Sequence, residues 1–295
     1  MVESVPNVSE GRDLRVVDRI GQAVRRSGAR LLDVHRDPDH HRSVYTLVGD
    51  PDIVVAGIVS MVETAIEAID IGRHRGEHPR IGAVDVIPFV PLGDASIDTC
   101  VSAARRAGEA IGGRFAVPVY LYEAAASRPE RRNLADVRRG GLARLAERIG
   151  SADGRPDFGP PQLHPRAGAT SVGARRVLVA YNVNLESDDL AAAKSIAAAV
   201  RASNGGLPGV KALGVRLHSR GLAQVTMNLT DVAATSVPAA FARVCEEAAR
   251  RGVGVLESEI VGLAPRSALG GASTESLRLT RPVEDVVLED RIASP

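Results

Sequence analysis

The chain has 295 residues, which is enough for two compact units of ordinary domain size. Apolar residues make up 44% and charged residues 25%, a balance typical of globular proteins that excludes a largely disordered chain. The net charge is only +1, which excludes a broad basic surface for nucleic acid or for an anionic membrane. Any anionic ligand must therefore be held by a local group of cations.

The cysteines and the N-terminus indicate a cytoplasmic protein. Cys100 and Cys245 lie far apart and match no metal or redox spacing, so we expect free thiols. No signal peptide and no apolar run of 18 residues is present, so we expect no membrane partner. With no Trp and only four Phe and four Tyr, a platform for stacking nucleic-acid bases is not expected either.

The first half of the chain predicts the order strand, helix, strand, strand, helix, strand. Leu14, Val17, Ile20 and Val24 recur at helical spacing, and Pro51 suits the first turn of a second helix. The strands are expected at 3–8, 30–34, 43–48 and 84–90, and the helices at 13–27 and 50–68.

The second half repeats this order, which is typical of an internal duplication. Its strands are expected at 177–184, 210–218, 223–229 and 255–260, and its helices at 188–203 and 237–251. Two βαββαβ units predict an α+β fold of two ferredoxin-like subdomains, each an antiparallel sheet with helices on one face. We expect the subdomains to pack with a ligand crevice between them.

Additional elements are expected between the two repeats. They are a helix at 96–112, a strand at 117–122 and an arginine-rich helical stretch at 127–150. A segment dense in glycine and proline follows at 152–161 and indicates the join. We assign residues 1–172, linker included, to the first subdomain and residues 173–295 to the second.

Histidines gather in two charged loops. Three of the seven histidines and two aspartates fall within 35–42, and His74 and His78 lie in a second loop. A metal site is one interpretation. However, the glycines and the proline around His78 disfavour the helix that would put both rings on one face. We expect no metal, and a His/Asp metal-dependent hydrolase remains an alternative.

His78 is a candidate for acid–base chemistry. Pro79 biases the preceding backbone to an extended conformation, which fixes the direction of the imidazole. Imidazole takes and returns protons near neutral pH, and the Arg80 guanidinium is suited to a two-point grip on a carboxylate. The alternative is that His78 only donates to a neighbouring main-chain carbonyl.

Two further segments suggest ligand contacts. Asn7 ends the first strand just before the first helix, where it is placed to present donors to an anion. Residues 157–170 are too long and too restricted by proline to be a simple spacer, which predicts a functional segment. No dinucleotide, P-loop or nucleophile-elbow motif occurs.

Five sequence runs together carry a family pattern. They are VPNVSEGR at 5–12, HRDPDHHRSV at 35–44, GEHPRIGAVD at 76–85, DFGP at 157–160 and GAT at 168–170. Taken together they resemble the glutamate formiminotransferase family, and the match extends to residues 258–263. The third run is highly specific for that family.

The resemblance implies transfer of a formimino group from N-formiminoglutamate to tetrahydrofolate, giving 5-formiminotetrahydrofolate and glutamate. It implies tetrahydrofolate as a co-substrate and two ferredoxin-like subdomains with a tunnel between them. Some family members carry a cyclodeaminase domain after this one, and the length of this chain predicts a monofunctional transferase. Exposed sheet edges favour a homodimer.

The resemblance also implies site residues. The family's catalytic histidine maps onto His78. The folate-contacting segment maps onto Gly159, Pro160, Pro161, Gln162, Leu163, His164, Pro165, Arg166, Ala167 and Gly168. From charge and position we assign the glutamate carboxylates to Arg80 and Arg42, with His35 and Asn7 as further substrate-binding candidates.

Four positions depart from the family pattern. Val8 and Ala167 stand where other members have Phe and Trp, which reduces the aromatic surface for the pterin. His35 replaces an Asp of some members, and His41 replaces an Asn. A related enzyme that processes 5-formyltetrahydrofolate or another one-carbon donor, and a folate-binding protein without turnover, remain alternatives.

Overall fold

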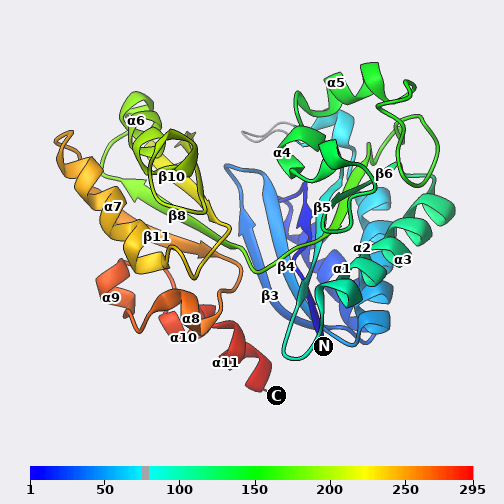
Figure 1. Cartoon of the computed structure of the whole chain (residues 1–295), viewed down its shortest axis with the longest axis horizontal. Coiled ribbons are helices and arrows are strands. Elements are labelled where there is room, and N and C mark those ends of the chain that lie inside the picture. The colour runs from blue at the N-terminus through cyan, green and yellow to red at the C-terminus, as the bar shows by residue number, and fades with distance from the viewer. Residues whose placement is uncertain (75–79, 295) are drawn as a thin grey trace. The chain divides into compact units, whose positions relative to one another are not determined.

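The computed structural model describes residues 1–74 and 80–294. The chain divides into two compact units, Met1–Arg176 and Val177–Pro295 (Figure 1). The expected boundary after residue 172 falls inside a strand of the first unit, Thr170–Ala174, so the observed division lies four residues later.

The first unit is built on a seven-stranded sheet. Its strands are β1 (Val2–Ser4), β2 (Asn7–Val8), β3 (Arg30–Asp37), β4 (Arg42–Gly49), β5 (Val84–Pro91), β6 (Val119–Glu123) and β7 (Thr170–Ala174). Across the sheet the order is β3, β4, then β1 and β2 together, then β5, β7 and β6. Both β1 and β2 pair with β4 and β5. They are two pieces of one strand, interrupted at Pro6, which has no N–H to donate to the ladder.

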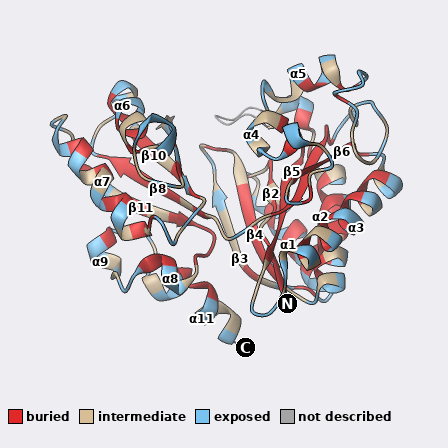
Figure 2. Cartoon of the chain, in the orientation of Figure 1, coloured by how far each residue is buried: buried red, intermediate tan, exposed pale blue. Residues whose placement is uncertain are grey.

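Three helices cover one face of this sheet (Figure 1). They are α1 (Leu14–Arg26), α2 (Pro51–Ala68) and α3 (Ile97–Phe115). Each begins after a residue whose side chain accepts a main-chain N–H of the first turn, namely Asp13, Asp50 and Ser96. Their apolar faces join one side of the sheet in a single buried core (Figure 2).

Strand β7 is absent from the sequence prediction, and it changes the character of the sheet. It lies parallel to both of its neighbours, β5 and β6, so the expectation of an antiparallel sheet is wrong for this unit. Helix α3 carries the chain from β5 to β6, and a helical crossover produces parallel strands. The crossover leaves a gap one strand wide, which residues 170–174 fill from much later in the chain.

The expectation that all helices lie on one face is also wrong for this unit. In place of one helical stretch at 127–150 there are η2 (Pro129–Arg131), α4 (Leu134–Val137) and α5 (Gly141–Arg148). Val137 of α4 and Leu145 of α5 are buried with Tyr120 and Tyr122 of β6. Because alternate residues of a strand point to opposite faces, these tyrosines require cover on the side away from α3.

The second unit contains a four-stranded antiparallel sheet in the order β11, β8, β10, β9. Its strands are β8 (Val179–Leu185), β9 (Val210–Leu217), β10 (Leu222–Leu229) and β11 (Val255–Val261). Its helices are α6 (Leu190–Val200), η3 (Ala202–Asn204), α7 (Val237–Ala249), α8 (Arg266–Leu269), α9 (Thr274–Leu277), α10 (Val283–Val286) and α11 (Leu288–Ala293). The predicted order of strands and helices is therefore present in both units, which makes the protein a mixed α+β fold with two sheets.

Both cysteines are free thiols. Cys100 lies in the core of the first unit, where burial raises the pKa of its thiol to about 11. No helix within residues 1–74 and 80–294 combines the length and the apolar character needed to cross a bilayer.

Candidate active site

A pocket in the first unit brings together residues from several distant segments. It is lined by Asn7, Val8, Ser9, Arg42, Arg80, Asp85 and Arg138. Its empty volume, including the open solvent at its mouth, is about 230 Å³. Among the described residues of the lining, three arginines and one aspartate give a formal charge of +2. The described lining therefore favours an anionic group.

Three of the four predicted substrate residues, Asn7, Arg42 and Arg80, share this pocket. The lining found within the described chain does not include His35, which lies on β3 opposite Val44 of β4. The predicted catalytic residue His78 lies outside the described residues, as do its neighbours at 75–77 and 79. The roles of all these residues stay predictions.

Arg80 is tied to the turn between β3 and β4. Its Nη2 donates to the carbonyl oxygen of His40 at 2.7 Å, and its Nη1 donates to that of His41 at 2.9 Å. Burial is the main cause that lowers the pKa of Arg80 to about 10, so the side chain stays charged at neutral pH. Arg80 therefore fixes the main chain of this turn as well as lining the pocket.

Two imidazoles meet beside Arg80. The ring centroids of His41 and His74 are 4.2 Å apart, and His74 Nε2 lies 3.0 Å from both Arg80 Nη1 and the His41 carbonyl oxygen. Burial, followed by the charge of Arg80, lowers the pKa of His74 to about 4. Burial also lowers the pKa of His41. Both imidazoles are therefore neutral at pH 7. Protonation of either ring would place a second positive charge next to that of Arg80.

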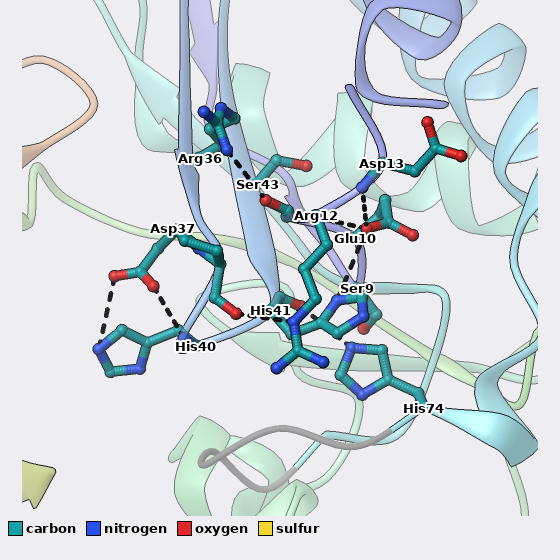
Figure 3. A network of polar contacts seen from close by, with 12 residues as sticks. Ser9, Glu10, Arg12, Asp13, Arg36, Asp37, His40, His41, Ser43 and His74 are labelled. Carbon is teal, nitrogen blue, oxygen red and sulfur yellow. Dashed lines mark hydrogen bonds and ion pairs between the residues drawn. The ribbon is translucent and has the colours of Figure 1, made fainter. Parts of the chain in front are cut away.

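The loop that follows β2 packs against the same turn (Figure 3). Glu10 Oε1 accepts hydrogen bonds from the main chain of Arg12 and Asp13, and lies 3.7 Å from His41 Nδ1. Arg12 Nε donates to the carbonyl oxygen of Pro38 at 2.9 Å. A Cβ at Gly11 would lie 2.3 Å from the Asp37 carbonyl oxygen, so only glycine permits this approach. The run at 5–12 thus packs against the turn between β3 and β4 that carries His40 and His41.

Asp85 occupies a bulge in β5. Asn7 is opposite Val86 and Val8 is opposite Val84, so Asp85 is the extra residue on its strand. A bulge of this kind re-aims a side chain. Asp85 Oδ1 accepts from the main-chain nitrogen of Ile81 at 2.7 Å, and Oδ2 accepts from Arg138 Nη1 at 2.8 Å. Asp85 therefore links the main chain at Ile81 to Arg138, the residue that follows α4.

The C-terminal part of the predicted folate segment forms a tight turn. The main chains of His164 and Gly168 exchange two hydrogen bonds of 3.0 and 2.9 Å. His164 Nδ1 accepts from the main-chain nitrogens of Arg166 and Ala167, which requires an unprotonated Nδ1. Consistent with this, burial lowers the pKa of His164.

This turn contacts both flanks of residues 75–79. On one side Ile71, in the short helix η1 (Ile71–Arg73), donates its N–H to the Arg166 carbonyl at 2.8 Å. On the other side Ala83 donates to the Ala167 carbonyl at 2.9 Å. Gly168 has φ +70°, and a Cβ there would lie 2.4 Å from the Ile81 carbonyl oxygen. Residues 166–168 are thus fitted closely to the chain on either side of the run that carries His78.

The N-terminal part of the folate segment is more open to solvent. Gly159, Pro161 and Gln162 are exposed, and Pro160 and Leu163 are partly buried. Just before them, Asp157 is anchored by a buried ion pair with Arg131, with Oδ2 and Nη1 2.7 Å apart. The segment therefore starts and ends at fixed points and exposes its middle.

Two lining residues, Asp85 and Arg138, are missing from the sequence-based site. Asp85 is the last residue of the specific run at 76–85, and that position was its available signal. Arg138 lies in a stretch so rich in arginine that nothing in the sequence distinguishes it. No group of three or more His, Cys, Asp or Glu residues suited to a metal ion occurs in the described parts of the chain.

Comparison with known families covers nearly the whole chain. The formiminotransferase domain, N-terminal subdomain, matches residues 1–175, and the formiminotransferase domain matches residues 180–280. The chain belongs to the formiminotransferase family. The resemblance inferred from the five sequence runs is thereby confirmed.

Individual relatives in this family match with high coverage. A glutamate formimidoyltransferase of Thermoplasma acidophilum is 45% identical over 99% of this chain and 97% of the relative. One of Streptococcus pyogenes serotype M1 is 44% identical over 91% of this chain and 90% of the relative. The formimidoyltransferase-cyclodeaminase of Rattus norvegicus is 41% identical over 91% of this chain, which spans 51% of that relative.

Proposed function

We propose that this protein transfers the formimino group of N-formiminoglutamate to tetrahydrofolate and releases glutamate. The observation that carries the proposal is the similarity to relatives named glutamate formimidoyltransferase, at 44–45% identity over at least nine tenths of both chains. The cationic pocket adds support, because both substrates carry carboxylates.

The proposed reaction needs one group that both takes and returns a proton. N5 of tetrahydrofolate attacks the amidine carbon and forms a tetrahedral intermediate. The bond from that carbon to the glutamate nitrogen then breaks, and the nitrogen leaves with a proton. His78 is proposed to take the proton from N5 and to give it to the departing nitrogen. Arg80, two residues later, has a guanidinium that is fixed by hydrogen bonds to the carbonyl oxygens of His40 and His41.

Residues 159–168 are proposed to contact tetrahydrofolate. Their support is the set of main-chain hydrogen bonds that join residues 166 and 167 to Ile71 and Ala83, on either side of 75–79. Alignment of two bound reactants contributes as much as about 7–11 kcal/mol to lowering a barrier. Asn7, Arg42 and Arg80 are proposed to bind the amino-acid substrate, and their common pocket supports this. His35 is kept in the proposal on the family pattern alone.

The fold type of each unit and the oligomeric state are also part of the proposal. Each unit is proposed to be ferredoxin-like, which is supported by the strand order β11, β8, β10, β9 in the second unit and the matching order of β3, β4, β1/β2 and β5 in the first. A homodimer is proposed because both sheets end in edge strands.

The test is incubation of the purified protein with N-formiminoglutamate and tetrahydrofolate, with release of glutamate measured over time. We expect release only when both substrates are present, and no loss of activity with a chelator. Release of glutamate without tetrahydrofolate would instead indicate a hydrolase. Binding of tetrahydrofolate without release of glutamate would indicate a binding protein.

A further inference from the structure

Arg138 is a pocket residue that the proposed function leaves without a role. It follows α4, far in sequence from the other lining residues, and its side chain is 30% exposed. Its Nη1 donates to Asp85, whereas its Nε is buried and has no hydrogen-bond partner among the described residues. A buried donor left unpaired is costly. The guanidinium therefore lines the pocket while Nη1 is its one nitrogen that is hydrogen-bonded within the described parts of the chain.

The described part of the pocket lining contains three arginines and one carboxylate, that of Asp85. Asp85 uses one oxygen for the main-chain nitrogen of Ile81 and the other for Arg138. After burial, the charges of Arg42 and Arg138 are among the causes that lower the pKa of Arg80. These arginines are thus close enough to disfavour one another. A ligand with two negative charges would match the formal +2 of the lining.

Arg80 is the arginine least available for a carboxylate in this arrangement. Both of its Nη atoms donate to carbonyl oxygens of the turn between β3 and β4. A planar, two-point contact with a carboxylate needs two donors directed to the same side. Arg138, which has only one Nη on Asp85, meets that need better.

We infer that Arg138 binds a carboxylate of the glutamyl group in the pocket that Arg42 also lines, and determines the specificity of the pocket for a dicarboxylic ligand. Asp85 orients Arg138, and Arg80 positions the turn between β3 and β4 in addition to its proposed contact with the substrate. The inference rests on the proposed function for the identity of the ligand. A glutamyl group occurs in N-formiminoglutamate and in the tail of tetrahydrofolate, and the two sources share this chemistry.

The experiment compares steady-state kinetics of the wild type, Arg138→Met and Arg138→Lys. We expect Arg138→Met to raise one KM about tenfold or more, with kcat changed by less than about threefold, because a charge-assisted contact to the bound substrate is lost. Arg138→Lys keeps the charge but loses the planar fork, so we expect partial recovery. A raised KM for N-formiminoglutamate alone assigns the site to the donor. A raised KM for tetrahydrofolate alone assigns it to the folate tail.

Arg139→Met is the matched control. Arg139 is the next residue, is 72% exposed, and pairs with Asp136 on the surface, so we expect neither KM to change. The double variant Arg138→Met/Asp85→Asn separates binding from structure, since it also removes the carboxylate that Arg138 neutralises. If Arg138 only compensates Asp85, the double variant regains both wild-type KM values, and the inference is overturned.

A direct binding measurement separates failure of this inference from failure of the proposed function. Calorimetry with L-glutamate, glutarate and L-glutamine measures the pocket without turnover. We expect the wild type to prefer the two dicarboxylates and Arg138→Met to lose that preference, even if the wild type releases no glutamate from N-formiminoglutamate. Equal binding of L-glutamate by the wild type and Arg138→Met overturns the inference while leaving the transferase activity intact.

Discussion

The carbonyl oxygen of Ala167 accepts a hydrogen bond of 2.9 Å from the main-chain nitrogen of Ala83. This bond joins the predicted folate segment to the end of the run that carries His78. A second bond, from Ile71 to Arg166, lies on the other side of that run. Because both bonds are between main chains, side-chain substitutions act on them only through backbone geometry.

His78→Ala is expected to lower glutamate release by about 10²- to 10⁴-fold, the usual contribution of a general acid–base group. Binding of tetrahydrofolate, measured by calorimetry, is expected to stay within about threefold of the wild type, because contacts to folate are assigned to other residues. Unchanged turnover would remove His78 from the catalytic role.

Arg80→Lys is expected to raise the KM for N-formiminoglutamate. An ammonium group lacks the planar fork that donates to the carbonyls of both His40 and His41, so the turn beside the pocket loses one of its anchors. Steady-state kinetics with varied donor concentration measures the effect. Kinetics identical to the wild type would show that Arg80 neither binds the substrate nor positions this turn.

Gly168→Ala is expected to lower both the thermal stability and the affinity for tetrahydrofolate. The new Cβ would have to share space with the Ile81 carbonyl oxygen, 2.4 Å away. Gly271→Ala is the matched control, because Gly271 has a similar φ of +76° and no atom within 4 Å of the added Cβ. The control should lose only the free energy of unfolding that a left-handed backbone conformation costs a residue other than glycine, about 1–2 kcal/mol. Equal losses in unfolding free energy at the two sites would contradict the close fit at Gly168.

Stability is expected to fall below pH 6.5, partly through His74. Its pKa in the folded protein is about 4, below the ordinary value of 6.5, so the unfolded chain binds more protons between these values. The stabilisation is complete above pH 6.5 and is lost as the pH falls toward 4. Urea unfolding at pH 7.5, 6 and 5 measures the slope. His74→Gln should unfold with a shallower pH dependence, and a slope equal to that of the wild type would exclude His74 as a cause.

Arg131→Met is expected to destabilise the protein by about 3–5 kcal/mol, since it leaves the largely buried Asp157 without its cation. Arg131 is 5% and Asp157 9% exposed. Arg139→Met breaks an exposed pair and should cost no more than about 1 kcal/mol. Denaturant unfolding of both variants gives the comparison. Similar small losses in both would mean that the Arg131 pair does not anchor the linker.

Regular elements with strong periodicity were predictable from the sequence. Helices α1 and α2 have clear start signals at Asp13 and Asp50, and the repeated strand and helix order gives the part that the two sheets share. Strand β7 was not predictable, because TSVGA has neither alternation nor a run of large apolar residues. Its position depends on the space that the β5–α3–β6 crossover leaves, which is a property of the assembled sheet.

The residues of the candidate site also divide into those that the sequence predicts and those that it does not. Asn7, Arg42 and Arg80 lie next to recognisable turns and motifs, and they do share one pocket. Arg138 reaches that pocket through the packing of α4 against the sheet, and Asp85 through a bulge in β5. Both placements arise from tertiary structure: no local pattern distinguishes Arg138, and the run at 76–85 includes Asp85 without showing that it lines the pocket.

The insertion of β7 between β5 and β6 has a consequence for protein synthesis. When the ribosome has translated the glycine- and proline-rich stretch at 152–161, β7, the strand that fills the gap between β5 and β6, has not yet been made. The nascent chain would therefore hold two open sheet edges until residue 174 has left the exit tunnel. A gene split near residue 155 would make that open intermediate permanent, whereas a split after Arg176 would release a complete N-terminal unit.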